Sequence, residues 1–244
     1  MIYMMNKIKR HIINVFNNFG YDITRLDQTN TMAGAIKRCA DRGVKINTVI
    51  DVGASNGSWS ELCRTFYPDA KYSLIEAQEE HKAGLESYIK NHPNSDYIIA
   101  AAGNREGKIF FDNSSLIGGL ASDTPFDKNC IEVPVKTIDQ IVSENKLLPP
   151  YLIKLDTHGY EVPIIEGAQE TLKKTNLVII ETYNFKLCNG CLKFYEMCEY
   201  LSELGFSSVE IVDLLHRKRD LCLWQMDIFY VPSDSNEFYN PTYD

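Results

Sequence analysis

The chain has 244 residues, of which 44% are hydrophobic and 24% charged, and its formal net charge is −8 at pH 7. This length and composition suit one globular domain with a sizeable core and exclude a largely disordered chain. The acidic charge, without any basic stripe interleaved with aromatic residues, argues against binding of nucleic acid.

The first predicted element is an amphipathic helix over residues 5–19 that ends at Gly20. Basic residues between Lys7 and His11 interleave with apolar residues at helical spacing. Charges interrupt any signal-peptide core, and no apolar run approaches the roughly 20 residues that span a bilayer. We favour packing of the apolar stripe on the domain or on a second subunit, as in a homo-oligomer. The alternative is peripheral contact with a membrane surface, at the inner face of the cell membrane.

Helix and strand patterns then alternate up to residue 102. The predicted elements are a helix over Asn30–Arg42, a strand over Thr48–Val52, a helix over Ser58–Phe66, a strand over Tyr72–Glu76, a helix over Glu79–Asn91 and a strand over Tyr97–Ala102. The strands are apolar and β-branched, which is typical of buried strands. Their order and short links predict parallel strands joined by right-handed crossovers.

The regular alternation of helices and strands is interrupted in the middle of the chain. Two strands are predicted over Lys108–Asp112 and Ile131–Lys136, around a loop from Asn113 to Asp127 that is rich in Ser, Gly and Asn. A connection of this length inside a compact domain is usually functional. We therefore expect the loop to fold over a substrate.

The C-terminal part is predicted to complete the sheet. Its elements are a helix over Thr137–Asn145, a strand over Tyr151–Leu155, a helix over Pro163–Lys174, a strand over Leu177–Glu181, a helix over Leu192–Leu204 and two strands over Ser207–Val212 and Gln225–Val231. The last two strands lack a crossover helix and are expected to pair as an antiparallel hairpin. We therefore predict an α/β domain over residues 46–232, an N-terminal helical extension over 1–45 and a flexible tail over 233–244.

Seven cysteines follow no disulfide-framework spacing. Cys188-x-x-Cys191 could belong to a zinc or redox site, but a second CxxC pair is missing and structural zinc normally needs four ligands. We therefore expect free thiols, no metal and a cytoplasmic location.

The first strand runs into a glycine loop, DVGASNG, at residues 51–57. Gly53 and Gly57 allow a tight turn and a close approach of the backbone to a ligand. Glu76 ends the second strand, where an acidic residue holds a ribose diol in nucleotide folds. The loop is not GxGxxG, which weakens a pyrophosphate site. S-adenosylmethionine, with adenosine but no phosphate, fits this pattern; the alternative is that the glycines only serve the turn.

The segment LIKLDTHGYEVPIIEGA, residues 152–168, delivers Asp156, His158 and Glu161 just after a buried strand. Ligands of open α/β sheets bind at this edge, so chemistry is expected here. His158 and Asp156 are rival candidates for a general base, and Glu181, at the end of the next strand, could orient either. His158 could also be a turn residue without a catalytic role.

Neighbouring residues have alternative roles. Glu161 could instead cap the following helix. Lys154 lies on the same strand face as Asp156 and is expected to pair with a buried carboxylate. Asp156 and Glu181 could also bind a divalent ion, although we expect no metal.

The segments VIDVGASNGSWS (49–60), SLIE (73–76) and LIKLDTHGYEVPIIEGA together resemble the FkbM family of S-adenosylmethionine-dependent methyltransferases, over about residues 48–232. The resemblance implies a Rossmann-like class I methyltransferase fold, with a seven-stranded, mostly parallel sheet, a C-terminal antiparallel hairpin and helices on both faces. It also implies methyl transfer to a hydroxyl, often on a sugar or polyketide. The cofactor contacts that follow from the glycine loop and the matching positions are Asp51, Gly53, Ala54, Ser55, Gly57, Glu76, Ala101, Ala102 and Asp156. Ser55 and His158 depart from the usual family residues.

The leading hypothesis is therefore an O-methyltransferase that uses S-adenosylmethionine and acts on a glycan or a secondary-metabolite hydroxyl, with Asp156, His158 and Glu181 as its catalytic residues. One alternative is a nicotinamide-dependent oxidoreductase, which the missing GxGxxG and the hairpin disfavour. Another is a non-catalytic cofactor-binding regulator of glycan assembly.

Overall fold

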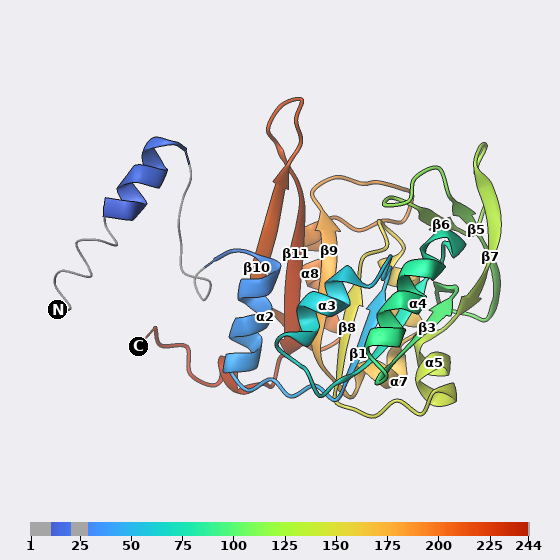
Figure 1. Ribbon diagram of the computed structural model, residues 1–244, viewed down its shortest axis with the longest axis horizontal. Coiled ribbons are helices and arrows are strands. Elements are labelled where there is room, and N and C mark those ends of the chain that lie inside the picture. The colour runs from blue at the N-terminus through green and yellow to red at the C-terminus, as the bar shows by residue number, and fades with distance from the viewer. Residues whose placement is uncertain (1–10, 21–28, 244) are drawn as a thin grey trace.

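A computed structural model describes residues 11–20 and 29–243. Its centre is a seven-stranded sheet in the order β10-β11-β9-β8-β1-β2-β3 (Figure 1). The strands are β1 (Thr48–Val52), β2 (Lys71–Glu76), β3 (Ser95–Ile99), β8 (Tyr151–Leu155), β9 (Thr175–Tyr183), β10 (Phe206–His216) and β11 (Leu223–Pro232). Five of them pair in parallel, whereas β11 runs antiparallel to both β9 and β10. The predicted α/β fold with a C-terminal hairpin is confirmed.

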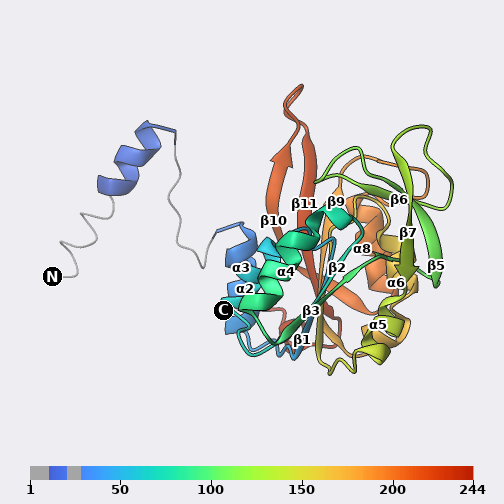
Figure 2. The same cartoon turned by 45° about the vertical axis from the view of Figure 1, so that its right-hand side comes forward.

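Helices cover both faces of this sheet (Figures 1 and 2). The helices are α2 (Met32–Asp41), α3 (Ser58–Arg64), α4 (Lys82–Asn91), α5 (Ile138–Glu144), α6 (Glu161–Glu166), α7 (Gln169–Leu172) and α8 (Phe194–Glu203), with 3-10 turns η2 (Glu79–His81) and η3 (Asn236–Phe238). Successive side chains of a strand point to opposite faces of the sheet. In β1, Ile50 therefore belongs to a buried cluster with side chains of α5, α6 and α8. Val49 belongs to a second buried cluster, with side chains of α2 and α4. The core therefore has two layers.

Helix α2 falls within the predicted N-terminal extension, but it packs into one of these layers. Ala35, Ile36 and Cys39 have no exposed surface. The Arg38 guanidinium lies 2.8 Å from the Glu210 carboxylate on β10. Helix α2 therefore covers the hairpin side of the sheet.

The predicted strand over residues 97–102 is divided between two sheets. β3 ends at Ile99, and β4 (Ala101–Ala102) pairs with β7 (Cys130–Lys136). With β5 (Gly107–Asp112) and β6 (Leu120–Ser122), these form a four-stranded sheet in the order β4-β7-β5-β6. Strand β6 lies inside the segment that was predicted as a loop. It was not predicted from the sequence because its three residues are too few to show a strand pattern.

The predicted helix over residues 163–174 is also divided, because α6 ends at Glu166, just before Gly167, and α7 begins at Gln169. A Cβ atom on Gly167 would lie only 2.0 Å from the Gly103 carbonyl oxygen. The close approach of these two backbones fixes the position of the helix break.

At the N-terminus, residues 11–18 are helical, whereas residues 5–10 of the predicted amphipathic helix lie outside the described residues. Four apolar side chains of this helix and its end are exposed: Ile12, Val15, Phe16 and Phe19. Contact with a second subunit or a membrane surface stays a prediction. In the described part of the chain, no helix is long and apolar enough to cross a membrane.

Candidate active site

A cavity of about 270 Å³ opens at the carboxyl edge of the main sheet. Its walls come from the C-terminal ends of β1, β2 and β9, from the residues that follow β1, β2 and β8, and from the segment between β5 and β6. Its lining includes Gly53, Ser55, Glu76, Ala101, Ala102, Asp156, His158 and Glu181. Most of the predicted site residues therefore share one cavity, since parallel strands end at the same edge of a sheet.

Gly53 allows the ends of β1 and β8 to come close together. Its φ is +78°, a left-handed conformation that disfavours any side chain. A Cβ atom there would lie 2.0 Å from the Asp156 carbonyl oxygen. The absence of a side chain thus keeps the glycine loop against the segment that carries Asp156.

We expect Gly53→Ala to lower the free energy of unfolding by more than the ~1–2 kcal/mol that a left-handed alanine costs, and to weaken cofactor binding. Gly205→Ala is the matched control, because Gly205 has φ +84° and no atom lies within 4 Å of the place that a Cβ atom would take. Chemical denaturation and calorimetric titration measure both effects. Equal destabilisation by the two variants would contradict the role of the close approach.

Glu76 is held rigidly at the end of β2. It is 6% exposed, and each carboxylate oxygen accepts a backbone amide at 2.8 Å, Oε2 from Ser55 and Oε1 from Gln78. Each oxygen retains a lone pair that can accept from a ligand. The geometry suits a pair of ribose hydroxyls.

Next to Glu76 the cavity wall is apolar. It is formed by Ala100, Ala101, Ala102, Phe111, Ala121, Tyr160 and Ile164. Small and aromatic side chains of this kind suit a flat heterocycle. The wall combines the start of the second sheet with the first turn of α6.

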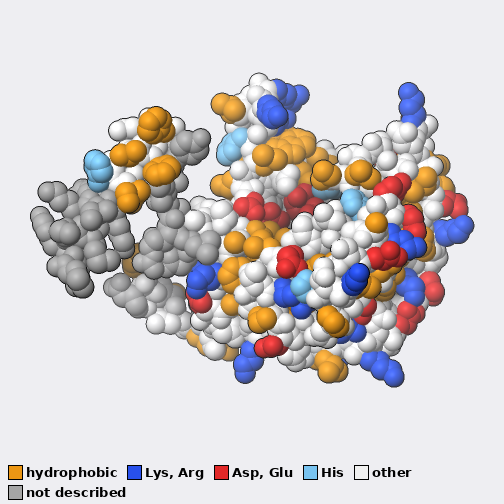
Figure 3. Space-filling view, in the orientation of Figure 1, with side chains coloured by type: hydrophobic (Ala, Val, Ile, Leu, Met, Phe, Trp, Pro, Cys, Tyr) orange, Lys and Arg blue, Asp and Glu red, His pale blue; other side chains and the backbone are white. Residues whose placement is uncertain are grey.

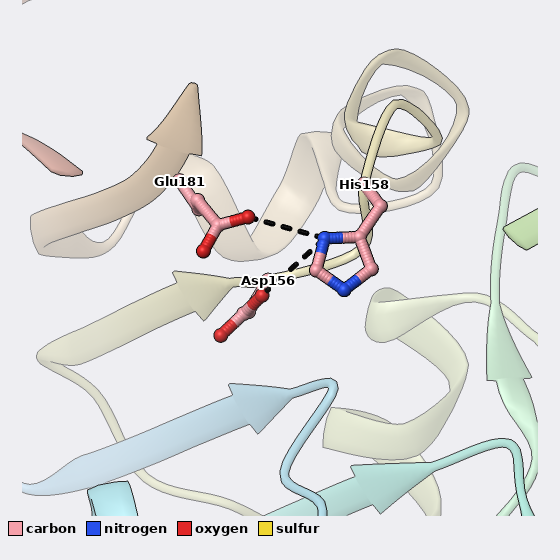
Figure 4. Close-up of side chains that lie close together, drawn as sticks. All are labelled: Asp156, His158 and Glu181. Atoms are coloured by element: carbon pink, nitrogen blue, oxygen red, sulfur yellow. Dashed lines mark hydrogen bonds and ion pairs between the residues drawn. The ribbon is translucent and has the colours of Figure 1, made fainter. Parts of the chain in front are cut away.

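At the other end of the cavity, Asp156 and Glu181 face the imidazole of His158 (Figure 4). His158 Nδ1 lies 3.1 Å from Glu181 Oε1 and 3.8 Å from Asp156 Oδ1. The Tyr183 hydroxyl lies 2.9 Å from the same nitrogen and also donates to Glu181. His158 has φ +56°, so the turn after β8 directs it toward the cavity.

The charges in this cluster control its proton equilibria. Burial lowers the pKa of His158, but the hydrogen bond to Glu181 and the charges of Glu181 and Asp156 outweigh burial and raise that pKa to about 9. Burial raises the pKa of Asp156, but the charge and hydrogen bond of Lys154, together with His158 and Glu181, outweigh burial and lower that pKa. A charged His158 between two carboxylates is therefore the resting state at neutral pH.

The sequence also matches a known family. The family model described as the methyltransferase FkbM domain matches residues 51–208, more than half of the chain.

The chain belongs to the FkbM methyltransferase family.

Solved structures agree with this fold. The chain is similar to methyltransferase FkbM from Methylobacillus flagellatus KT, with TM-score 0.50 and 16% identity over 75% of this chain and 43% of that one. It thus spans less than half of that protein's length. It is also similar to a Klebsiella pneumoniae protein named as an O-methyltransferase, with TM-score 0.50 and 10% identity over 91% and 88% of the two chains. No protein of curated function matches the chain in sequence.

Membership of the FkbM family makes the chain a methyltransferase, and methyltransferases of this class use S-adenosylmethionine. The cavity fits that cofactor, since it combines a fixed ribose acceptor, an apolar wall and a glycine that lets the backbone approach. The carboxylates of Asp156 and Glu181, at the other end of the cavity, attract the positively charged sulfur of the cofactor. Glu76, Gly53, Ser55, Ala101 and Ala102 would hold it.

Three residues expected to contact the cofactor, Asp51, Ala54 and Gly57, are not among the residues that line this cavity. Asp51 has no exposed surface, accepts a hydrogen bond from Ser60 Oγ at 2.7 Å and lies 3.8 Å from Lys154 Nζ. Ala54 belongs to the buried core, and Gly57 faces Tyr88 across the α3 N-terminus. A contact of these three residues with the cofactor stays a prediction.

Lys154 and Glu161 hold the segment that carries Asp156 and His158. Lys154 Nζ lies 2.8 Å from Asp156 Oδ2, as expected from their shared strand face. Glu161 is buried, and its Oε1 accepts from the Gly159 amide at 2.8 Å and the Thr157 hydroxyl at 3.1 Å. Glu161 therefore stabilises the turn and the start of α6.

The segment between β5 and β6 folds over the cavity, in line with the expected position of the loop. Leu116 and Ile117 line the cavity. The Ile117 carbonyl oxygen lies 2.9 Å from His158 Nε2, and that of Leu116 lies 2.8 Å from His81 Nε2. Two histidines thus attach this segment to the site.

Sequence reasoning missed Gln78 and Gln225 as site residues, and it considered Tyr183 only as an aromatic that could stack on a sugar, not as a partner of His158 and Glu181. Gln78 donates to the covering segment, and Gln225 Nε2 lies 2.5 Å from Glu181 Oε2. Gln225 reaches Glu181 from β11, through a strand pairing that spacing along the chain does not reveal. Tyr183, two residues after Glu181, could have been found from strand alternation.

Cys188 and Cys191 form a disulfide in the loop before α8, so the prediction of free thiols is wrong for this pair. A Cβ atom on Gly159 would lie 2.4 Å from Cys191 Sγ and 3.1 Å from Cys188 Sγ. The turn that carries His158 therefore packs against this disulfide. The free cysteines of the described residues are Cys39, Cys63, Cys130, Cys198 and Cys222.

Proposed function

We propose that this methyltransferase transfers the methyl group of S-adenosylmethionine to a hydroxyl of a glycan or of a secondary metabolite. The observation that carries the proposal is His158 at one end of the cavity, with Nδ1 held 3.1 Å from Glu181. An alcohol is a weak nucleophile at neutral pH, and a histidine oriented by a carboxylate is a recurrent proton acceptor. The preference for a sugar rests on the family resemblance.

When bound, S-adenosylmethionine supplies a methyl group that moves to the acceptor oxygen as its bond to sulfur breaks, leaving S-adenosylhomocysteine. His158 takes the hydroxyl proton as the new carbon–oxygen bond forms. Glu181 holds Nδ1, so the proton is received at Nε2. Nε2 now lies 2.9 Å from the Ile117 carbonyl oxygen, and the acceptor hydroxyl must replace this oxygen as its hydrogen-bond partner. Acceptor binding is thereby linked to displacement of the covering segment.

The proton acceptor must be a neutral imidazole, whereas the pKa of His158 is raised to about 9, chiefly by Glu181 acting against burial. A cationic sulfur in the same cavity opposes a second positive charge and lowers that pKa. Cofactor binding therefore prepares His158 to accept a proton. Asp156 is the weaker candidate, because Lys154 lowers its pKa.

A transfer assay tests the proposal. The purified protein is incubated with methyl-labelled S-adenosylmethionine and hydroxyl-bearing acceptors, including glycan extracts, and labelled products are identified by mass spectrometry. A methyl ether is the expected product. Binding of NAD without S-adenosylmethionine in calorimetric titration would support an oxidoreductase instead. Cofactor binding without any methylated product would support a regulator.

We expect methyl transfer to be independent of divalent metal. The ligand-type atoms of Asp156, His158 and Glu181 do lie within 4.8 Å of one another, a spacing that a metal could use. However, Lys154 already neutralises Asp156, and Gln225 already occupies Glu181 Oε2. Turnover should therefore stay unchanged after dialysis against EDTA. A loss that magnesium restores would contradict this expectation.

A further inference from the structure

A second cavity, of about 340 Å³, lies beyond Asp156 and Glu181, which line both cavities. The other lining residues are Met32, Ser58, Trp59, Leu62, Lys154, Asp213 and Asp227. Figure 3 shows acidic side chains gathered below the β10–β11 hairpin. The shared residues place this cavity next to the reaction centre, on the side away from Glu76.

The charge in this cavity is unbalanced. Four carboxylates line it, from Asp156, Glu181, Asp213 and Asp227, against one lysine. That lysine, Lys154, is already 2.8 Å from Asp156. The cavity therefore repels an anionic ligand and attracts a cation.

Among these four carboxylates, that of Asp227 would be stabilised most by a bound ligand. It lies opposite Glu181 in the pairing of β9 with β11 and is only 7% exposed. No hydrogen bond or ion pair within the described ranges 11–20 and 29–243 involves its carboxylate. Burial first, and then the charge of Glu181, raise the pKa of Asp227 to about 7. A buried carboxyl without a partner is costly, and a ligand that donates to it removes the cost.

From this geometry we infer that the second cavity binds one end of the methyl acceptor, an ammonium group that pairs with Asp227, while the acceptor hydroxyl reaches His158 in the first cavity. This inference rests on the proposed methyl transfer to a hydroxyl. The substrate class is a small hydroxyl compound with a free amine, such as an amino sugar. Trp59 offers an aromatic wall to such a ring.

The amino-acid end of S-adenosylmethionine also carries an ammonium group. Pairing of Asp227 with the acceptor and pairing with the cofactor predict different results. If Asp227 binds the acceptor, its replacement weakens acceptor binding and leaves cofactor affinity unchanged. If it binds the cofactor, its replacement weakens the affinity for S-adenosylhomocysteine, which has the same amine.

The experiment measures binding rather than turnover, so it does not depend on the transfer reaction. The protein is saturated with S-adenosylhomocysteine and titrated with glucosamine, glucose or glucosamine 6-phosphate, followed by NMR. Glucosamine should bind at least ~10-fold more tightly than glucose, as expected for a hydrogen bond between charged groups. The phosphate should weaken binding.

Asp227→Asn should remove the preference for glucosamine over glucose and change the affinity for S-adenosylhomocysteine less than about 2-fold. Asp69→Asn, an exposed residue outside both cavities, should match the wild type. Three results would overturn the inference: equal binding of glucosamine and glucose, no binding of either sugar, or a parallel loss of affinity for S-adenosylhomocysteine. Failure of the proposed function would appear separately, as absence of methyl transfer by a protein that binds these ligands.

Discussion

Replacement of His158 by alanine should reduce turnover about 100-fold to 10,000-fold, the usual contribution of a positioned general base. The affinity for S-adenosylmethionine should change little, because the ribose acceptor Glu76 lies at the opposite end of the cavity. Steady-state kinetics with a methylated acceptor and calorimetric titration of the cofactor measure the two quantities. His216→Ala is the control, since His216 is an exposed residue of β10 outside the cavity.

The pH dependence of kcat/KM provides a second test of the role of His158. His158 accepts a proton only when neutral, so kcat/KM for S-adenosylmethionine, which reports the free enzyme, should rise with pH toward the raised pKa of about 9 as the imidazolium loses its proton. In His158→Ala this rise should disappear and leave a low, flatter profile. Near-normal turnover in the variant, with the rise intact, would transfer the role to Asp156 or remove the need for a base.

The placement of the site was predictable because it follows from the parallel sheet. The apolar runs Thr48–Val52 and Tyr151–Leu155 form strands with the predicted bounds. Once such strands are parallel, the residues after them must meet at one edge. This is why Glu76, Asp156, His158 and Glu181 could be grouped from the sequence.

The features that sequence reasoning missed depend on contacts between distant segments. The register of β11 against β9 brings Asp227 opposite Glu181 and Gln225 opposite Tyr183. Helix α6 ends just before Gly167 because Gly167 meets Gly103, far away in the chain. Asp51 is buried outside the cavity lining because Lys154 and Ser60 hold it there. No local pattern encodes such pairs.

The rigid hold on Glu76 implies a large effect at the other end of the cavity. Glu76→Ala should weaken S-adenosylmethionine binding by at least about 1.5–3 kcal/mol, the value of a hydrogen bond to a charged group. The loss has two sources, because the ribose loses its acceptor and the amides of Ser55 and Gln78 lose the oxygens that fix the loop.

Calorimetric titration measures the loss in Glu76→Ala, with Glu80→Ala as the control because Glu80 is exposed and lies outside the cavity. Thermal unfolding separates the two sources. If the variant unfolds as the wild type does, the lost affinity belongs to the ribose contact; if its stability also falls, loop fixation contributes. Unchanged affinity in a folded variant would refute the ribose role and, with it, the orientation that places the reacting sulfur beside His158.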